Sequence, residues 1–227
     1  MDEKIKFMIG KEIDLLKNYP KTKRNLFERA ENKSEIDRSI ARRFDKDFFD
    51  GDRRYGYGGF RYHPKFWQPV IPTFKEYWKL NHNNSVLDIG CGKGFMLFDL
   101  TQYIPGIKVR GIDISKYAID NCHDQVKDFL SVGNANNLPF ENKSFDVVIS
   151  INTIHNLEIE ECAKALNEIS RVSKKYSFIT VDAYRNEKEK EAMLAWNLTA
   201  KTIMSVDEWK QFFSKNNYHG DFYWFIP

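Results

Sequence analysis

Cysteine is scarce in this 227-residue chain, and the three that occur, Cys91, Cys122 and Cys162, are widely spaced. An odd number of separated cysteines provides neither a disulfide framework nor paired metal ligands, so we expect a reducing compartment, the cytoplasm, and no bound metal. Apolar runs of about 18 residues are absent as well, which excludes a conventional membrane-spanning helix. The N-terminus alternates charged and apolar residues, unlike the continuous core of a signal peptide.

Neither sign of charge dominates, because the net charge at neutral pH is +3. Residues 1–65 contain 17 Lys and Arg against 12 Asp and Glu, whereas the remaining residues contain 18 against 20. Acidic residues are interspersed among the basic ones throughout. This mild bias does not favour a nucleic-acid partner.

What the chain does contain is a glycine-rich turn after an apolar strand. Residues 85–95 read S-V-L-D-I-G-C-G-K-G-F, with glycine at every second position from Gly90 to Gly94. Such glycines mark a place where backbone passes close to a ligand, or simply a tight strand-to-helix turn. The spacing differs from the G-x-G-x-x-G of pyrophosphate-binding turns. Asp88 at the strand end would repel a pyrophosphate and favour a cationic group.

This segment resembles motif I of the class I S-adenosylmethionine-dependent methyltransferases. Three later segments resemble the motifs that follow it: G-I-D-I-S around Asp113, G-N-A-N-N-L-P-F from Gly133, and the β-branched run at 145–151. The resemblance implies an α/β fold with a doubly wound, mostly parallel sheet of six to seven strands. It also implies S-adenosylmethionine as the cofactor.

Several residues in these motifs are candidates for holding the cofactor. Asp113 would accept hydrogen bonds from both ribose hydroxyls, with helix capping as its alternative role. Asn134 replaces the family's usual Asp, and its amide can still pair with adenine. The cofactor-binding residues implied by the resemblance are Asp88, Gly90, Cys91, Gly92, Asp113, Ile114, Asn134, Ala135 and Ile151.

Methyl transfer from a sulfonium is an in-line displacement, for which the protein chiefly aligns the acceptor and excludes water. Ser150 and Asn152 stand where metal-dependent relatives carry carboxylates. The N-P-P-[YF] signature of enzymes that methylate amino groups of nucleobases or glutamine is absent. His155, just after the strand at 145–151, is the candidate general base, because imidazole can take a proton near neutral pH. The alternative is that His155 has no catalytic role, because the resemblance implies a His at this position in many relatives without one.

Residues 1–80, here called the extension, are predicted to form a helical cap with a lid. Apolar spacing predicts an amphipathic helix over 3–17, whose face could join a homodimer, and a second helix after Ser34 with a stripe from Ile36 to Phe48. Residues 48–67, here called the aromatic segment, interleave rings, arginines and glycines. They predict a mobile lid or an ordered loop that packs the extension onto the sheet. The predicted acceptor-side and lid residues are Tyr57, Arg61, Tyr62, His63, Asn152, Asn156 and Tyr184.

The C-terminal region is predicted to complete the sheet. A helix should run from Cys162 to Val172, a strand should cover 176–181, and Ser205 should cap a further helix. The family's proline and glycines before that strand are missing, so we expect an altered turn there. The apolar segment 222–226 ends the chain, and the final hairpin of the family is expected to be incomplete.

The sequence therefore predicts a class I methyltransferase of the type-11-like, small-molecule subgroup. Residues 81–227 would form the S-adenosylmethionine-binding domain. We expect an O or N atom of a small molecule as the methyl acceptor. The alternatives are an RNA or protein methyltransferase that uses the basic extension, and a non-catalytic, cofactor-binding partner subunit.

Overall fold

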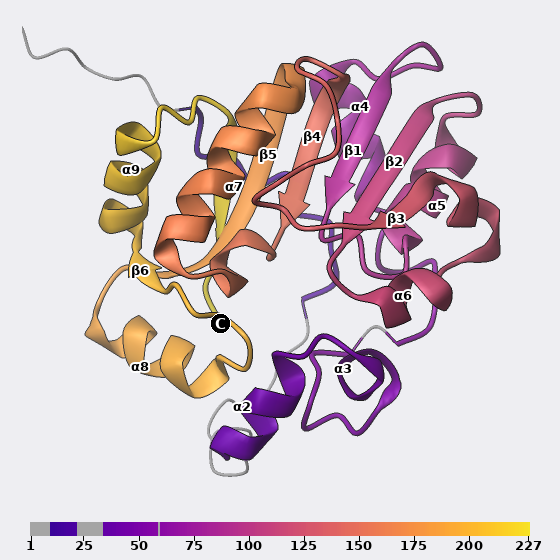
Figure 1. Ribbon diagram of the computed structural model, residues 1–227. Coiled ribbons are helices and arrows are strands. Elements are labelled where there is room, and N and C mark those ends of the chain that lie inside the picture. Colours follow the sequence, from indigo (N-terminus) through magenta and orange to yellow (C-terminus); the bar gives the residue numbers. More distant parts are fainter. Residues whose placement is uncertain (1–9, 22–33, 59) are drawn as a thin grey trace, which may run out of the picture.

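The computed structural model describes residues 10–21, 34–58 and 60–227, which form a three-layer α/β arrangement (Figure 1). One seven-stranded sheet has the order β3-β2-β1-β4-β5-β6, with β7 also paired to β5. Every named strand pair is parallel. The strands are β1 (Ser85–Ile89), β2 (Lys108–Asp113), β3 (Leu130–Val132), β4 (Phe145–Ile151), β5 (Ser173–Tyr184), β6 (Met204–Ser205) and β7 (Asp221–Phe225). The predicted doubly wound sheet is confirmed, and β7 lies parallel to β5 rather than closing a hairpin.

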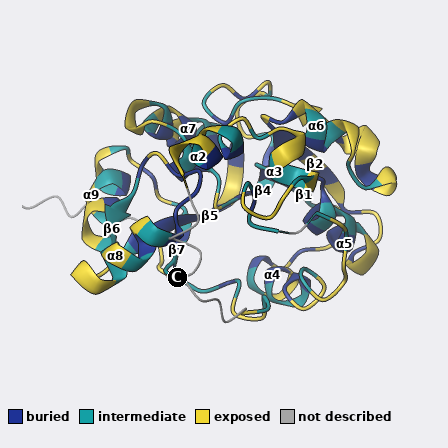
Figure 2. Ribbon diagram, turned by 90° about the horizontal axis from the view of Figure 1, so that it is seen from below, coloured by how far each residue is buried: buried dark blue, intermediate teal, exposed yellow. Residues whose placement is uncertain are grey.

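Helices cover both faces of the sheet, as the β-branched strands require. Along β4, Val147 and Ile149 join one hydrophobic cluster and Val148 joins the other, which is the alternation of a strand buried on both sides. Figure 2 shows α4 and α7 on opposite sides of the strands. The helices are α2 (Glu35–Ala41), α3 (Lys46–Asp50), α4 (Ile71–Trp78), α5 (Phe95–Tyr103), α6 (Lys116–Asp120), α7 (Ile159–Val172), α8 (Glu187–Trp196) and α9 (Val206–Lys215), with 3-10 turns η1 (Asp124–Phe129) and η2 (Ile154–Asn156).

The C-terminal predictions are largely confirmed. The helix at 162–172 is α7, and Ser205 forms a capping box with Glu208 at the start of α9. The altered turn is an absent one, because α7 ends at Val172 and β5 begins at Ser173. β5 is therefore longer at both ends than the predicted strand.

The helix predicted over 3–17 is wrong where the structure describes it. Residues 11–13 instead pair with β7, and residues 15–18 form a turn. Ile13 N–H donates to the carbonyl of Phe222 at 3.0 Å, and Phe222 N–H donates to the carbonyl of Lys11 at 3.0 Å. The exposed edge of β7 offers backbone partners that outweigh the local helical spacing. Residues 1–9 lie outside the described part of the chain. The helical face suggested for a homodimer is therefore not formed by residues 10–17.

The second predicted helix exists but is shorter than its apolar stripe. Ser34 and Asp37 form the expected capping box at the start of α2. The stripe does not continue in one helix, because Phe44 adopts a left-handed φ of 50° and Asp45 caps the separate helix α3. Ile36, the first residue of the stripe, is 70% exposed.

The sheet's carboxyl edge is where a ligand is expected in this topology. The chain leaves β1 toward β2 on one side, and β4 adjoins β1 on the other, so the strand order reverses between β1 and β4. Figure 1 shows these strands pointing toward α2 and α3 of the extension. The extension therefore lies across the edge at which the motif residues emerge.

Candidate cofactor and acceptor site

The motif I turn, residues 90–94, has a geometry that only glycine adopts easily. Gly90 has a φ of +81°, and a Cβ built on it would lie 2.0 Å from Oγ1 of Thr153. The turn is tied to the neighbouring strand, because Gly90 N–H donates to the carbonyl of Ile112 at 2.7 Å. Close packing thus accounts for Gly90 without a ligand, and the case for a ligand depends on the side chains around the turn.

A cavity of about 210 Å³ opens beside this turn. Five of the nine predicted cofactor residues line it, namely Asp88, Gly90, Cys91, Gly92 and Ile151. Burial raises the pKa of the Cys91 thiol well above its usual range, so that thiol is neutral. The remaining lining residues are Tyr19, Phe48, Phe49, Gly58, Arg61, His63, Phe66 and Trp67 from the extension, and Lys93, Phe95 and Met96 from the methyltransferase-like domain.

Asp88 is the buried acid of this cavity. It is 5% exposed, and burial, with a smaller contribution from Asp113, raises its pKa to about 8. Within the described part of the chain no hydrogen bond stabilises its carboxylate. A buried carboxylate without a donor is costly, and a cationic ligand group would relieve that cost. Asp88 can therefore hold a cationic group, and its role in binding the amino group of S-adenosylmethionine stays a prediction.

Asp113 holds the motif I turn in place. Its Oδ2 accepts a hydrogen bond from Gly92 N–H at 2.7 Å, and its Oδ1 accepts one from Ser115 N–H at 2.8 Å. Burial raises the pKa of Asp113, and these two hydrogen bonds oppose the rise. A carboxylate has about four lone-pair positions, so two remain for ribose hydroxyls. The ribose role stays a prediction, and the positioning role is one that the sequence did not indicate.

The predicted adenine side lies next to Asp113 but outside the cavity. Gly133 N–H donates to the carbonyl of Asp113 at 2.9 Å, which places the 133–135 loop beside it. Ile114 is 55% exposed, and Ala135 is buried in the core. Asn134 Oδ1 accepts a hydrogen bond from Asn136 N–H at 3.2 Å, so its oxygen is engaged within the loop. Adenine binding by this loop stays a prediction.

Lys93, inside the motif I turn, makes a contact that the sequence analysis missed. Its Nζ lies 2.6 and 2.7 Å from the two carboxylate oxygens of Asp50, and 2.9 Å from the carbonyl of Phe60. Tyr117 on α6 donates to the same carboxylate at 2.8 Å. Burial raises the pKa of Asp50, but the hydrogen bonds from Lys93 and Tyr117 outweigh it and bring the pKa below its usual value. The network fastens the extension over the motif I turn.

The aromatic segment is ordered by two tyrosines that the sequence assigned to the lid. The Tyr57 hydroxyl accepts a hydrogen bond from Leu198 N–H at 2.8 Å, and its ring stacks on Trp196. The Tyr62 hydroxyl donates to Asp99 Oδ1 at 2.7 Å. Neither tyrosine lines the cavity, whereas Arg61 does. The contacts match an ordered loop, and the mobile lid stays a prediction.

His155, the predicted general base, is buried beside β5 and does not line the cavity. Its Nδ1 accepts a hydrogen bond from Asp182 N–H at 3.0 Å, and its Nε2 lies 3.7 Å from Asp182 Oδ2. Burial lowers the pKa of the imidazole, with the Asp182 charge opposing, and protonating Nδ1 would remove its acceptor. The general-base role stays a prediction that this geometry does not support.

The three other predicted acceptor residues also lie off the cavity lining. Asn152 has a left-handed φ of 52°, and its Oδ1 accepts a hydrogen bond from Thr180 Oγ1 at 2.9 Å. Asn156 Nδ2 donates to the carbonyl of Asn152 at 3.3 Å. Tyr184 donates to Glu208 at 3.4 Å. These side chains hold the loop after β4 and the start of α9.

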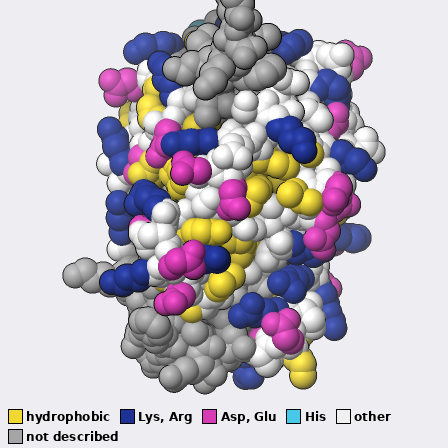
Figure 3. Space-filling model, turned by 90° about the vertical axis from the view of Figure 1, so that its left-hand side faces the viewer, with side chains coloured by type: hydrophobic (Ala, Val, Ile, Leu, Met, Phe, Trp, Pro, Cys, Tyr) yellow, Lys and Arg dark blue, Asp and Glu magenta, His cyan; other side chains and the backbone are white. Residues whose placement is uncertain are grey.

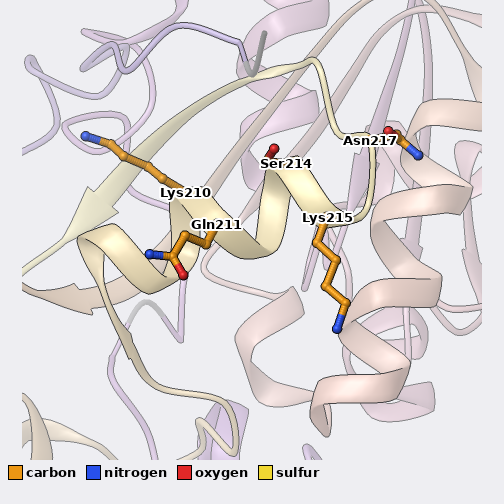
Figure 4. Close-up of a pocket in the computed structure, with 5 residues that line it drawn as sticks. All are labelled: Lys210, Gln211, Ser214, Lys215 and Asn217. Carbon is orange, nitrogen blue, oxygen red and sulfur yellow. The ribbon is translucent and has the colours of Figure 1, made fainter. Parts of the chain in front are cut away.

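A second hollow lies on the outer face of α9, away from the motif residues (Figure 4). Its side chains do not converge on one point, and Lys210 is paired with Glu12 at 2.8 Å. Over residues 10–21, 34–58 and 60–227, no three His, Cys, Asp or Glu side chains are grouped to hold a metal ion. In the same ranges no helix has the length and apolar character to cross a membrane.

Residues 80–218 match the protein family described as a methyltransferase domain. This chain therefore belongs to that family, and its fold and motifs are those of the class I S-adenosylmethionine-dependent methyltransferases. Family and fold imply S-adenosylmethionine as the methyl donor.

The curated relatives are similar over part of their length. A tRNA (carboxymethyluridine(34)-5-O)-methyltransferase from Arabidopsis thaliana is 34% identical over 143 residues, covering 62% of this chain and 33% of the relative. A demethylmenaquinone methyltransferase from Lactococcus lactis is 42% identical over 72 residues, 28% of either chain. This chain spans between 28% and 59% of the length of the first curated relatives it matches.

Among solved structures, the YcgJ protein from Bacillus subtilis has a TM-score of 0.53 at 20% identity, covering 64% of this chain and 66% of that one. A putative methyltransferase in complex with the Haloferax volcanii Trm112 methyltransferase activator has a TM-score of 0.52 at 24% identity, covering 63% and 65%. At these identities the likeness concerns the fold.

Proposed function

We propose that this protein transfers a methyl group from S-adenosylmethionine to an O or N atom of a small-molecule acceptor. The observation that carries the proposal is the cavity that joins the unpartnered carboxylate of Asp88 to an aromatic roof from the extension. Asp88 would hold the cofactor's amino group, and Asp113 would hold its ribose. The bound cofactor would supply an activated methyl group, so no metal is required.

The chain's own contribution is to align the acceptor and to exclude water. Phe49 lies over the motif I turn, with a ring carbon 3.4 Å from where a Cβ on Gly92 would be. The Lys93–Asp50 network keeps that ring in place. Water would be expelled from the space in which the methyl group is transferred.

The size of the cavity favours a small acceptor over a polymer. At about 210 Å³ it is smaller than a typical drug-sized site of about 300–1,000 Å³. The few, separated cysteines support the cytoplasm as the location.

RNA methylation is the second candidate, favoured by the similarity to a tRNA methyltransferase. On the face around α8 and α9, basic and acidic side chains are interspersed, so this face offers no basic patch for RNA (Figure 3). Activation by a partner subunit, as in the Haloferax volcanii complex, and the non-catalytic partner role are further alternatives. No contact among the described residues supports either of them.

The test is a transfer assay with isotopically labelled S-adenosylmethionine in fractionated extract, followed by mass spectrometry of the labelled product. We expect label in a fraction of low molecular mass, and loss of label with Asp88→Asn. Label confined to RNA or protein would replace the small-molecule proposal. Tight cofactor binding with no labelled product in any fraction would favour the partner-subunit role.

A further inference from the structure

We infer that the acceptor is a free, single-ring planar compound bearing an anionic group, and that Arg61 binds that anion. This inference rests on the proposed function and names the acceptor's chemical class. It follows from the walls of the cavity, the state of its charged groups and its size.

The walls contributed by the extension are aromatic and mutually packed. The Tyr19 ring centroid lies 5.7 Å from that of Phe66 and 5.0 Å from that of Trp67. Phe49 closes the cavity over the motif I turn. Rings packed against each other move little, so a flat ligand can stack on them with a small loss of conformational entropy.

Of the charged groups that line the cavity, only Arg61 is left for an acceptor. Lys93 is fully engaged by Asp50 and the Phe60 carbonyl. Asp88 is the partner proposed for the cofactor's amino group. Arg61 is exposed and forms no hydrogen bond or ion pair within the described residues. Its charge helps to lower the pKa of Asp50, but Lys93 and Tyr117 already occupy the oxygens of that carboxylate.

An unpaired guanidinium at the rim of an aromatic cavity selects an anion by a bidentate, charge-assisted contact. His63 adds a second polar group, because its Nδ1 accepts from Lys65 N–H and leaves Nε2 for a ligand. A cationic acceptor would be repelled by Arg61. A neutral acceptor would leave the guanidinium unused.

The size of the cavity favours an acceptor with one ring. About 210 Å³ must also hold the amino-acid half of the cofactor beside Asp88. A ring with one carboxylate suits the space that remains beside the aromatic walls. We therefore place a free small molecule, and not a polymer, in the cavity.

The experiment measures binding of four matched probes to the full chain saturated with S-adenosylhomocysteine, by quenching of tryptophan fluorescence and by ligand-observed NMR. Benzoate has both predicted features. Benzyl alcohol lacks the charge, cyclohexanecarboxylate lacks the flat ring, and benzylammonium reverses the charge. We expect benzoate to bind about tenfold or more tightly than benzyl alcohol and benzylammonium, the size of one charge-assisted contact. It should also bind more tightly than cyclohexanecarboxylate, which keeps the charge but cannot stack on the rings.

Two variants assign the effect to a residue. Arg61→Gln should weaken benzoate binding by about tenfold and leave benzyl alcohol unchanged, because only the charged contact is removed. Arg43→Gln, an exposed arginine of the same extension that does not line the cavity, should change neither.

The outcomes separate this inference from the proposed function. Failure of S-adenosylhomocysteine to bind would overturn the proposed function. Normal cofactor binding with equal affinity for benzoate and benzylammonium would overturn only the acceptor class. If a single-stranded oligonucleotide bound in an Arg61-dependent manner while benzoate did not, the free small molecule would be replaced by RNA.

Discussion

Lys93 and Asp50 form an ion pair in which the buried ammonium contacts both oxygens of a partly exposed carboxylate, at 2.6 and 2.7 Å. One residue belongs to the glycine-rich turn and the other ends α3 of the extension, 43 positions earlier. The lysine side chain is only 7% exposed. This pair therefore fixes α3 of the extension, which covers the cavity, to the motif I turn.

Asp50→Asn should weaken the attachment of α3 to the motif I turn. The neutral amide cannot balance the buried ammonium, so we expect a loss of about 2 kcal/mol in the free energy of unfolding and faster hydrogen exchange in residues 46–58. Urea titration and exchange mass spectrometry measure the two effects. The control is Asp47→Asn on the exposed face of the same helix, and equal behaviour of the two variants would contradict the role of the pair.

Asp88→Asn should stabilise the protein in the absence of cofactor while weakening cofactor binding. The folded-state pKa of Asp88, about 8, lies above that of an unfolded aspartate, so its stabilising contribution is present at low pH and is lost as pH rises to about 8. The variant lacks this loss. Its advantage in melting temperature over the wild type should therefore grow from pH 6 to pH 8.5, and a constant difference would show that Asp88 is not perturbed.

Gly90→Ala should cost more than an ordinary left-handed glycine replacement. The new Cβ would meet Thr153, in addition to the strain of a φ of +81°. Gly106→Ala is the matched control, because Gly106 has a φ of +88° and only a His82 contact at 3.3 Å. We expect about 1 kcal/mol for the control and at least twice that for Gly90→Ala, with partial recovery in the Thr153→Gly background. Equal costs would argue against the clash.

His155→Gln should affect stability rather than cofactor binding. Burial lowers the pKa of His155 below that of an unfolded histidine, so its contribution is present above about pH 6.5 and is lost as pH falls. At pH 7.5 the variant should unfold at a lower urea concentration than the wild type, and the difference between the two midpoints should be smaller at pH 5.5. A general base would instead show unchanged stability and a large fall in kcat.

Local patterns predicted the local structure well. The β-branched run at 145–151, the glycine-rich turn and the capping boxes at Ser34 and Ser205 depend on neighbours within a few positions. The Lys93–Asp50 pair and the pairing of residues 11–13 with β7 depend on contacts far apart in the chain, which carry no pattern in one sequence. His155 follows the right strand, but its direction is set by the Asp182 backbone, which the motif does not encode.

Calorimetric titration of S-adenosylmethionine into the protein at pH 7, in two buffers of different ionisation enthalpy, tests whether Asp88 binds the cofactor. A pKa of about 8 for Asp88 means that most of the free protein carries a protonated Asp88 at this pH, and we expect that carboxyl to ionise when it binds the cofactor's amino group. We predict that the wild-type protein releases about one proton when it binds the cofactor. Asp88→Asn should release none and should bind the cofactor at least tenfold more weakly. If S-adenosylmethionine did not bind, or bound equally well to Asp88→Asn, Asp88 would not be the residue that holds the cofactor's amino group.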